Sequence, residues 1–541
     1  MRTTAAQSIA LPRTRVPLAG WAAEGVALLA LLPLATALAC SLAASGAESG
    51  YAAWWGTPRG WLALARTAYL AAMAATCATV LAWTLVAAAA RLPRRWADAS
   101  AYLACLPLLV PSSLMATAWT VALGREGPLA QGLAALVGGE VRLPVDSFGT
   151  AAVVMALRYF GLAVLVLTYA WRRLEADWPA RQVFRIPRGA ALVHLVVRPA
   201  IRPTAAAWLL VALFAMNDHI IPGMFLISTY GTQVLIQYSA LLDPNGAAAL
   251  AAPMAAVGAA AVAVVLWEGK RTWADLDRPA PARRPPPGRW GRVLGAGVAA
   301  GVLALALAVP VGVLAHKAGS WQAMGEALLS ARRQAWQTLV LASAAGALCM
   351  AGAGLLAARW AGAWRRGAPT AVPLVLLNLT VPPSLLAIGM IRLAQTPALA
   401  AVRDTAWPLV VGYALRFMPV ATLALYALWR REAVEPLAAA RVHGLSPWRT
   451  MRHVLWPRHR LTLVAAGLLG ALLAATELEM SVLLVPPGAG TLGVRLYTLI
   501  HTAPESMTSA LALDILLLAG PAIILLGWLL SLVRRKTAED G

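Results

Sequence analysis

The chain has 541 residues, of which 60% are hydrophobic and only 13% are charged, and its mean hydropathy is +0.69. A soluble protein of this size could not hide that much apolar surface, so we expect lipid to be its solvent. The net charge of +22 and the pI of 11.1 would suit a nucleic-acid-binding protein. No groove-reading or stacking element accompanies the basic residues, however, which excludes nucleic acid as a partner.

The apolar residues gather in twelve stretches of about 20 residues, the length that crosses a hydrocarbon core roughly 30 Å thick. In chain order these stretches lie near residues 21–45, 62–90, 100–123, 149–171, 203–227, 248–268, 292–315, 335–358, 370–393, 405–428, 461–485 and 509–533. They predict an all-α, polytopic membrane protein with about twelve transmembrane helices.

The basic residues predict the orientation of the chain. When the N-terminus is placed in the cytoplasm, the cytoplasmic segments hold 33 of the 45 lysine and arginine residues. This positive-inside asymmetry predicts that both termini are cytoplasmic. The four cysteines fall within predicted spans and the seven histidines lack metal-ligand spacing, so we expect no metal site.

The predicted spans are written twice in the sequence. Landmarks recur in the same order: Thr67/Thr338 and Pro111/Pro382 share an offset of 271 (338 − 67, 382 − 111), Arg158/Arg416 and Pro199/Pro457 share an offset of 258 (416 − 158, 457 − 199), and Thr232–Tyr238 matches Thr491–Tyr497 at 259 (491 − 232). Such repeats predict two similar six-helix units with a site or pathway between them. The first unit would cover residues 1–268, a Pro/Arg-rich cytoplasmic linker 269–291, and the second unit 292–541.

The charged residues inside predicted spans include Arg158, Asp218, Arg416, Glu477 and Glu479. An isolated charge at the centre of a span costs about 2.5–3.5 kcal/mol, so each needs a partner or water. We expect Arg158 to pair with an acid of its own half, and Arg416 to pair with Glu477 or Glu479. The two glutamates lie about 200° apart around a helix, so at most one of them lines a pathway directly.

Polar residues and prolines inside the spans are the candidates for lining the pathway. A proline frees backbone carbonyls that neighbouring helices or a polar cavity must satisfy. Two interpretations stay open: these residues line the pathway near an external gate, or they form structural ion pairs and packing kinks. The candidates are Pro111, Ser112, Asn217, Asp218, Pro382, Pro383, Ser384, Thr476, Glu477 and Glu479.

Two polar loops, after the fourth and tenth spans, occupy corresponding places in the repeats. Each holds a short helical stretch, a turn, and a second helical stretch that ends at a proline. A short helix held parallel to the membrane in this way would offer a protruding knob to a soluble partner. The candidate docking residues are Arg181, Ile186, Pro187, Gly189, Pro199, Arg441, Gly444, Ser446, Pro447 and Pro457.

The second loop resembles the cytoplasmic Glu-Ala-Ala loop of ATP-binding-cassette (ABC) importer permeases. Gly444 and Pro457 are separated by the same spacing as in that pattern (457 − 444 = 13), and Ala438-Ala439-Ala440 occupies the Glu-Ala-Ala positions. In the first loop, Ile186 replaces the glycine. The strings LVPSSLMATAW, ALRFMP and ATELEMSVLLVPPGAGTLGVRLYTLIH are similar to the fused permeases of iron(III) and thiamine importers, so the resemblance covers nearly the whole chain.

This resemblance implies the transmembrane subunit of an importer in the bacterial inner membrane. Two ABC ATPase subunits would dock on the loops, and a periplasmic solute-binding protein would deliver a small solute, with iron(III) or a thiamine-like cation favoured. The chain has no GxxxxGK[ST] phosphate loop, so ATP would be bound by the partner subunits. The chain itself would need no cofactor and would not be an enzyme.

An ion-coupled secondary transporter is the alternative, because such transporters can also show two six-helix repeats. Asp218 and Glu477 would then carry protons. A membrane-embedded enzyme is a third class, but the sequence shows no acid/base or metal constellation for it.

Overall fold

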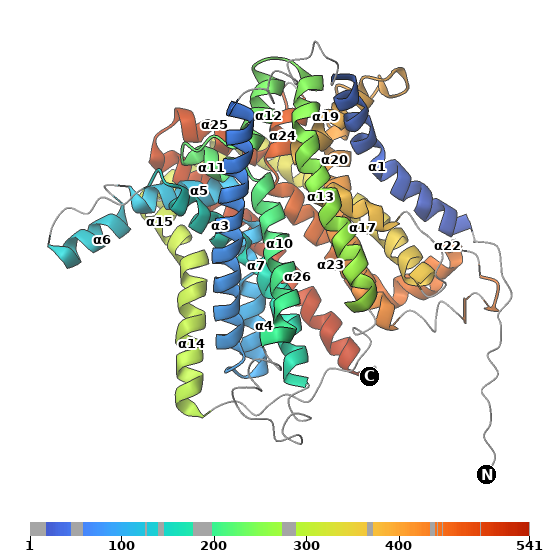
Figure 1. The fold of residues 1–541 in the computed structure, drawn as a ribbon, viewed down its shortest axis with the longest axis horizontal. Coiled ribbons are helices and arrows are strands. Elements are labelled where there is room, and N and C mark those ends of the chain that lie inside the picture. Colours follow the sequence, from blue (N-terminus) through green and yellow to red (C-terminus); the bar gives the residue numbers. More distant parts are fainter. Residues whose placement is uncertain are drawn as a thin grey trace.

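The computed structural model describes residues 18–44, 58–124, 127–138, 145–176, 197–272, 288–364, 372–432, 439–440, 442–445, 447–486 and 488–539. Every regular element in these residues is a helix (Figure 1). Ten helices are long and apolar enough to cross a membrane, or up to 12 if each of two bent helix pairs is one span. The prediction of an all-α polytopic membrane protein is therefore confirmed.

The long helices follow the predicted apolar stretches, because a helix satisfies its own backbone hydrogen bonds and so suits a lipid environment. In chain order they are α1 (Leu18–Ala44), α3 (Pro58–Ala89), α7 (Phe148–Ala176), α10 (Arg198–Asn217), α13 (Pro244–Thr272), α14 (Arg289–Leu303), α17 (Arg332–Trp364), α20 (Trp407–Glu432), α23 (Trp456–Ala475) and α26 (Glu505–Glu539). A π-turn, η4 (Ala304–Ala308), joins α14 to α15 (Val309–Ala318), which completes that span.

The predicted third and ninth spans are the two bent pairs. In the first pair, α4 (Arg94–Leu103) and η1 (Leu106–Leu109) turn by 96° into α5 (Ser112–Leu123). In the second, η5 (Val372–Leu376) and α18 (Leu377–Thr380) turn by 108° into α19 (Pro383–Ala394). Both turns fall where the sequence places prolines, at Pro111 and at Pro382–Pro383, because a proline cannot donate the helical hydrogen bond.

The predicted fifth and eleventh spans, 203–227 and 461–485, are present as α10 and α23, but the helices end about ten residues earlier than expected. Helix α10 ends at Asn217 and a short helix, α11 (Ile220–Met224), follows. Helix α23 ends at Ala475 and α24 (Glu479–Leu484) follows. The next helices, α12 (Tyr230–Ser239) and α25 (Leu492–Thr502), carry the matched segments Thr232–Tyr238 and Thr491–Tyr497, with Thr491 as the N-cap of α25.

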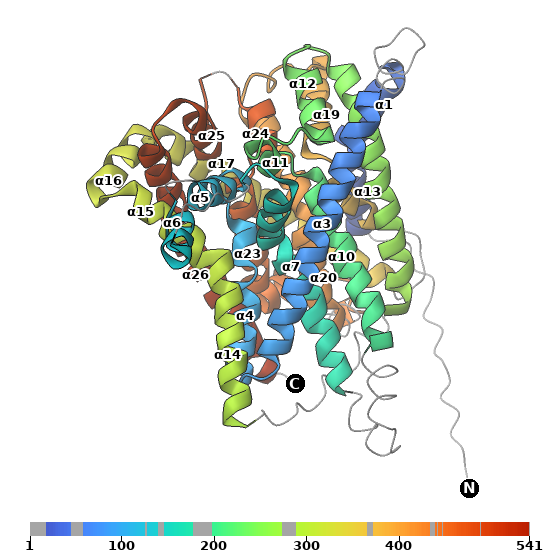
Figure 2. The ribbon, with the colours of Figure 1, turned by 60° about the vertical axis from the view of Figure 1, so that its left-hand side comes forward.

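Shorter helices lie around these spans. Helices α6 (Pro128–Val137) and α16 (Trp321–Ser330) lie in the half of the molecule away from the C-terminus (Figure 2). The turn η6 (Pro397–Leu399) follows α19, and α22 (Pro447–Thr450) continues through a π-turn, η7 (Met451–Leu455), into α23.

The hydrophobic core forms two clusters, and each of them draws helices from both predicted units. One cluster joins α3, α5, α7, α10 and α11 to α14–α16, α25 and α26. The other joins α17–α20, α23 and α24 to α1, α12 and α13. The linker at 269–291 therefore does not divide the core, since the outer helices of each predicted unit pack into the core built on the other.

At two of the contacts between a helix of one predicted unit and a helix of the other, a glycine allows the backbones to approach closely. A Cβ atom on Gly389 of α19 would overlap the Pro33 carbonyl oxygen of α1. A Cβ atom on Gly295 of α14 would lie 2.7 Å from the Ala88 carbonyl oxygen of α3. Small residues let helix backbones approach closely where lipid supplies no hydrophobic drive for association. The first helix of each predicted unit is thus fixed tightly to a helix of the other.

Candidate functional site

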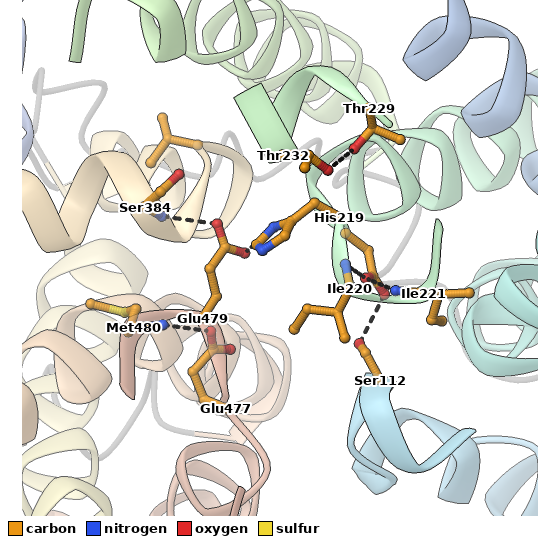
Figure 3. Close-up of polar contacts among 12 residues, drawn as sticks. Ser112, His219, Ile220, Ile221, Thr229, Thr232, Ser384, Glu477, Glu479 and Met480 are labelled. Carbon is orange, nitrogen blue, oxygen red and sulfur yellow. Dashed lines mark hydrogen bonds and ion pairs between the residues drawn. The ribbon is translucent and has the colours of Figure 1, made fainter. Parts of the chain in front are cut away.

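Four helix breaks meet in one region, in the half of the molecule away from the described termini (Figures 1 and 3). They are the breaks before α5 and α19, and the breaks after α10 and α23. Polar contacts join them in pairs: Ser112 with Asp218, Asn217 with Thr380, and His219 and Ser384 with Glu479. A helix break exposes backbone donors and acceptors that need partners inside a membrane, so polar side chains gather there.

Asp218 sits between α10 and α11 and accepts four hydrogen bonds. Its Oδ2 atom accepts from the Ser112 hydroxyl and from the Tyr159 hydroxyl, each at 2.8 Å. Its Oδ1 atom accepts from the backbone N–H groups of Ile220 and Ile221 at 3.0 and 3.1 Å. The carboxylate therefore caps α11 and ties it to the start of α5, an arrangement that stabilises its negative charge.

Arg158 of α7 lies beside this carboxylate, with its Nε atom 4.0 Å from Asp218 Oδ2. The guanidinium also lies over the Tyr159 ring, 5.3 Å from the ring centroid. Its Nε and Nη1 atoms are buried and have no hydrogen-bond partner in the described part of the chain. The pair thus balances charge without a direct hydrogen bond between the two groups.

Glu477 and Arg416 form the corresponding pair in the second half. The Arg416 Nε atom lies 3.7 Å from Glu477 Oε2, and Glu477 Oε1 accepts a long hydrogen bond of 3.4 Å from the Met480 N–H (Figure 3). Arg416 also donates from Nη1 to the Val381 carbonyl at 3.2 Å. This carbonyl is one of those freed by the proline break, so the arginine serves both the acid and the broken helix.

Glu479 does not pair with an arginine. Its Oε1 atom accepts from the Ser384 N–H at the start of α19 at 3.2 Å. Its Oε2 atom lies 3.5 Å from His219 Nδ1 (Figure 3). Glu477 and Glu479 thus point to different partners, because the chain turns at Thr476 and Leu478 before α24 begins. Of the two acids that the sequence offered to Arg416, the structure places Glu477 beside it.

Asn217 makes a second contact between the sequence halves. Its Nδ2 atom donates to the Thr380 carbonyl, the last residue of α18, at 2.9 Å. Its Oδ1 atom is buried without a hydrogen-bond partner in the described part of the chain. The break before α19 therefore draws one donor from each half, Asn217 from the first and Arg416 from the second.

The remaining pathway candidates have local roles. Pro111 and Pro382 are the capping residues that precede α5 and α19, and Pro383 is the first residue of α19. The Thr476 hydroxyl donates to the Leu473 carbonyl in its own helix at 3.0 Å. Among the described residues, no group of three or more His, Cys, Asp or Glu side chains could hold a metal ion.

His219, Tyr159 and the Thr380 carbonyl belong to this site but were not among the predicted residues. His219 follows Asn217-Asp218 directly, and a polar triplet inside an apolar stretch was the available signal. Tyr159 follows Arg158, where an aromatic residue reads as ordinary core. The Thr380 carbonyl is a backbone atom, and only the position of the proline break indicates that it needs a donor.

The loop candidates are only partly described. Arg181, Ile186, Pro187, Gly189, Arg441 and Ser446 lie outside the described residues. Pro199 and Pro457 are exposed and are the second residues of α10 and α23. Gly444 is exposed with φ +67°, and a Cβ atom there would meet nothing within 4 Å. Pro447 opens α22, which packs against α1.

The starts of α12 and α25 revise the predicted register. The Tyr230 N–H donates to the Thr67 hydroxyl and the Leu492 N–H donates to the Thr338 hydroxyl, each at 2.8 Å. Tyr230 and Leu492 open their helices, and their offset is 262 (492 − 230). Thr491 therefore corresponds in position to Thr229, and the predicted match of Thr491 with Thr232 is wrong by one helical turn.

Comparison with known proteins gives no further assignment, since the chain matches no protein-family model, no curated protein and no solved structure.

Proposed function

We propose that this chain is the transmembrane permease of an ABC importer, built from two related six-helix units. It would sit in a bacterial inner membrane with both termini in the cytoplasm. Two ATPase subunits would grip the loops around Ile186 and Gly444, and a periplasmic binding protein would deliver the solute. The solute class carried over from the resemblance is a small cation such as iron(III) or thiamine.

The Gly444 turn is the observation that carries this proposal. A left-handed, exposed glycine with empty space around it ends one short helical turn, and Pro447 begins the next. The Leu445 N–H donates to the Ala440 carbonyl at 2.9 Å, which closes the turn as glycine C-caps do. A fixed, exposed turn directly before α22 is the shape that a cleft in a soluble subunit would accept.

The equivalent positions of the landmark residues support two related units. Thr67 and Thr338 accept matching backbone hydrogen bonds, Pro199 and Pro457 hold the same place in α10 and α23, and both arginines lie beside an acid of their own half. The acids are each engaged by donors of the chain itself. We therefore assign solute selectivity mainly to the binding protein rather than to these carboxylates.

The geometry of Asp218 disfavours the ion-coupled alternative. A proton carrier must exchange its proton during each cycle, yet this carboxylate accepts four hydrogen bonds that protonation would disturb. Uptake that collapses with an uncoupler while ATP stays high would overturn the importer proposal.

Replacing Gly444 tests the proposal directly. We expect Gly444→Trp to abolish association with the ATPase subunits, measured by co-purification from membranes, and to remove solute-stimulated ATP hydrolysis. The chain itself should still insert, because nothing in the described structure lies within 4 Å of a Cβ atom built at Gly444.

Gly138 provides the matched control. It ends α6 in the left-handed helical region, with φ +74° and ψ +22°, and it also is exposed with nothing within 4 Å of a built Cβ atom, so Gly138→Trp imposes a left-handed backbone strain of about 1–2 kcal/mol. We expect this control to retain the ATPase. Equal loss in both variants would point to strain, and normal coupling in Gly444→Trp would contradict the proposed docking loop.

A further inference from the structure

At the candidate site, two polar contacts join the sequence halves, and in both of them the first half contributes the Asn or His side chain. Both side chains come from the end of α10, and both partners belong to the second half. Asn217 donates to the Thr380 carbonyl at 2.9 Å, and His219 Nδ1 lies 3.5 Å from Glu479 Oε2. Together they fasten the α10–α11 junction to the start of α19 and to the start of α24.

The corresponding positions of the second half do not return these contacts. The starts of α11 and α24, Ile220 and Glu479, give an offset of 259 in this region (479 − 220), which matches Asn217 to Thr476 and His219 to Leu478 (476 − 217, 478 − 219). Thr476 bonds to its own helix, and Leu478 is apolar. The first half therefore supplies the side chains Asn217 and His219, and the second half supplies their partners. These contacts form at one place, so the halves can separate there by breaking a single set of contacts.

Each member of the His219–Glu479 pair is held in place by its own half. The His219 side chain packs on Gly231 of α12, where a built Cβ atom would lie 3.0 Å from His219 Cβ. Glu479 is held by the Ser384 N–H at 3.2 Å. The pair therefore joins two side chains that are each packed against, or bonded to, a neighbouring helix.

We propose that Asn217 and His219 form a one-sided latch that closes the pathway between the halves at the end away from the termini. The latch rests on the proposed permease function, in which it opens once in every transport cycle. The Arg158–Asp218 and Arg416–Glu477 pairs lie within single halves and stay closed. Opening of the pathway at this point breaks the Asn217–Thr380 and His219–Glu479 contacts, which water replaces.

A metal bridge tests the latch. Two ligand atoms of one tetrahedral Zn²⁺ lie about 3.3 Å apart, close to the observed separation of His219 Nδ1 and Glu479 Oε2. We expect Zn²⁺ to raise the Tm of the purified Glu479→His chain by several degrees, and to lower its ATP-driven uptake about tenfold or more in membranes. A chelator should reverse both effects.

The His219→Ala/Glu479→His double variant, which keeps only one ligand of the pair, is the control, and Zn²⁺ should not affect it. A Tm rise without loss of uptake would show that the pair stays closed during transport and would overturn the latch. The absence of a Tm rise would overturn the pairing itself. Uptake that continues without any ATPase partner would overturn the permease proposal instead, and the Tm measurement on the isolated chain separates that outcome from failure of the latch.

A second variant covers the case in which Glu479→His does not fold. Asn217→Cys with Thr380→Cys places two thiols at the other crossing contact, and a short thiol-specific cross-linker should join them. We expect cross-linked protein to lose uptake and to regain it when a cleavable linker is cut. Each single variant serves as control, and full uptake by the cross-linked chain would overturn the proposal.

Discussion

The helix breaks before α5 and before α19 both leave backbone groups that need hydrogen-bond partners, and the two breaks are stabilised by different groups. The first is organised around one buried carboxylate, Asp218, whose four donors and neighbouring Arg158 all come from the first half. The second is organised around freed carbonyls, and the Thr380 carbonyl takes its donor from the opposite half. The first break is therefore complete within its own half, whereas the second depends on how the halves meet.

Charge reversal at Arg416 should give the largest effect. Arg416→Glu sets a second acid beside Glu477 and removes the donor to Val381, and breaking a buried pair costs about 3–5 kcal/mol. We expect little monodisperse protein in gel filtration after detergent extraction. Adding Glu477→Arg restores opposite charges and should recover part of the loss.

The equivalent double charge reversal in the first half provides a comparison. Arg158→Glu with Asp218→Arg also restores opposite charges, but a guanidinium accepts no hydrogen bonds and cannot replace the four that Asp218 accepts. We expect no recovery there. Equal recovery in the two halves would mean that opposite charge alone determines stability at both pairs. The difference in hydrogen bonding between the two breaks would then not affect stability.

Replacing a buried tyrosine in each region should give a smaller loss of stability, and the loss should differ between the two regions. Tyr159→Phe removes a hydrogen bond to a buried carboxylate, which costs about 1.5–3 kcal/mol, whereas Tyr413→Phe removes a bond to the neutral Ser481 hydroxyl, which costs about 0.5–1.5 kcal/mol. Thermal unfolding in one detergent should therefore show the larger fall in Tm for Tyr159→Phe. The opposite order would argue against Asp218 as the centre of the first break.

The smallest effect concerns the turns before α12 and α25. Leu226 has φ +59° and its side chain is 81% exposed, while Gly488, at the same offset that relates the two helix starts, has φ +79°. A left-handed conformation costs a non-glycine residue about 1–2 kcal/mol. Gly488→Leu should thus lower the Tm, and Leu226→Gly should leave it unchanged or raise it slightly. A fall in Tm for Leu226→Gly would mean that the exposed leucine has a stabilising contact.

Much of the fold could be predicted because long apolar stretches in lipid have few alternatives to a helix. The proline breaks at Pro111 and Pro382 were also visible, since a proline removes a helical donor. The ends of α10 and α23 were not visible. Apolar residues continue on both sides of Asp218 and of Glu477, so hydropathy alone extends the helix through the break that the acid caps.

The candidate site could be predicted in its members more than in its contacts. The repeat and the cost of isolated charges singled out Arg158, Asp218, Arg416 and Glu477, which the structure brings together in two pairs. Nothing in the sequence joined His219 to Glu479, because that contact depends on how two halves separated by a linker meet. The exchange of outer helices was hidden for the same reason, since helices of similar composition pack equally well in either core.

Helix α1 packs against a helix of the second predicted unit, and this determines when α1 can pack during synthesis of the chain. Pro33 lies against Gly389, which the ribosome adds only after most of the intervening chain has been made. At roughly 5–20 residues per second, α1 waits about 20–70 s for its partner. Lipid holds it meanwhile, because a helix needs no neighbour to satisfy its backbone. The first span of the chain therefore packs only after α19, which lies far along the sequence, has been made.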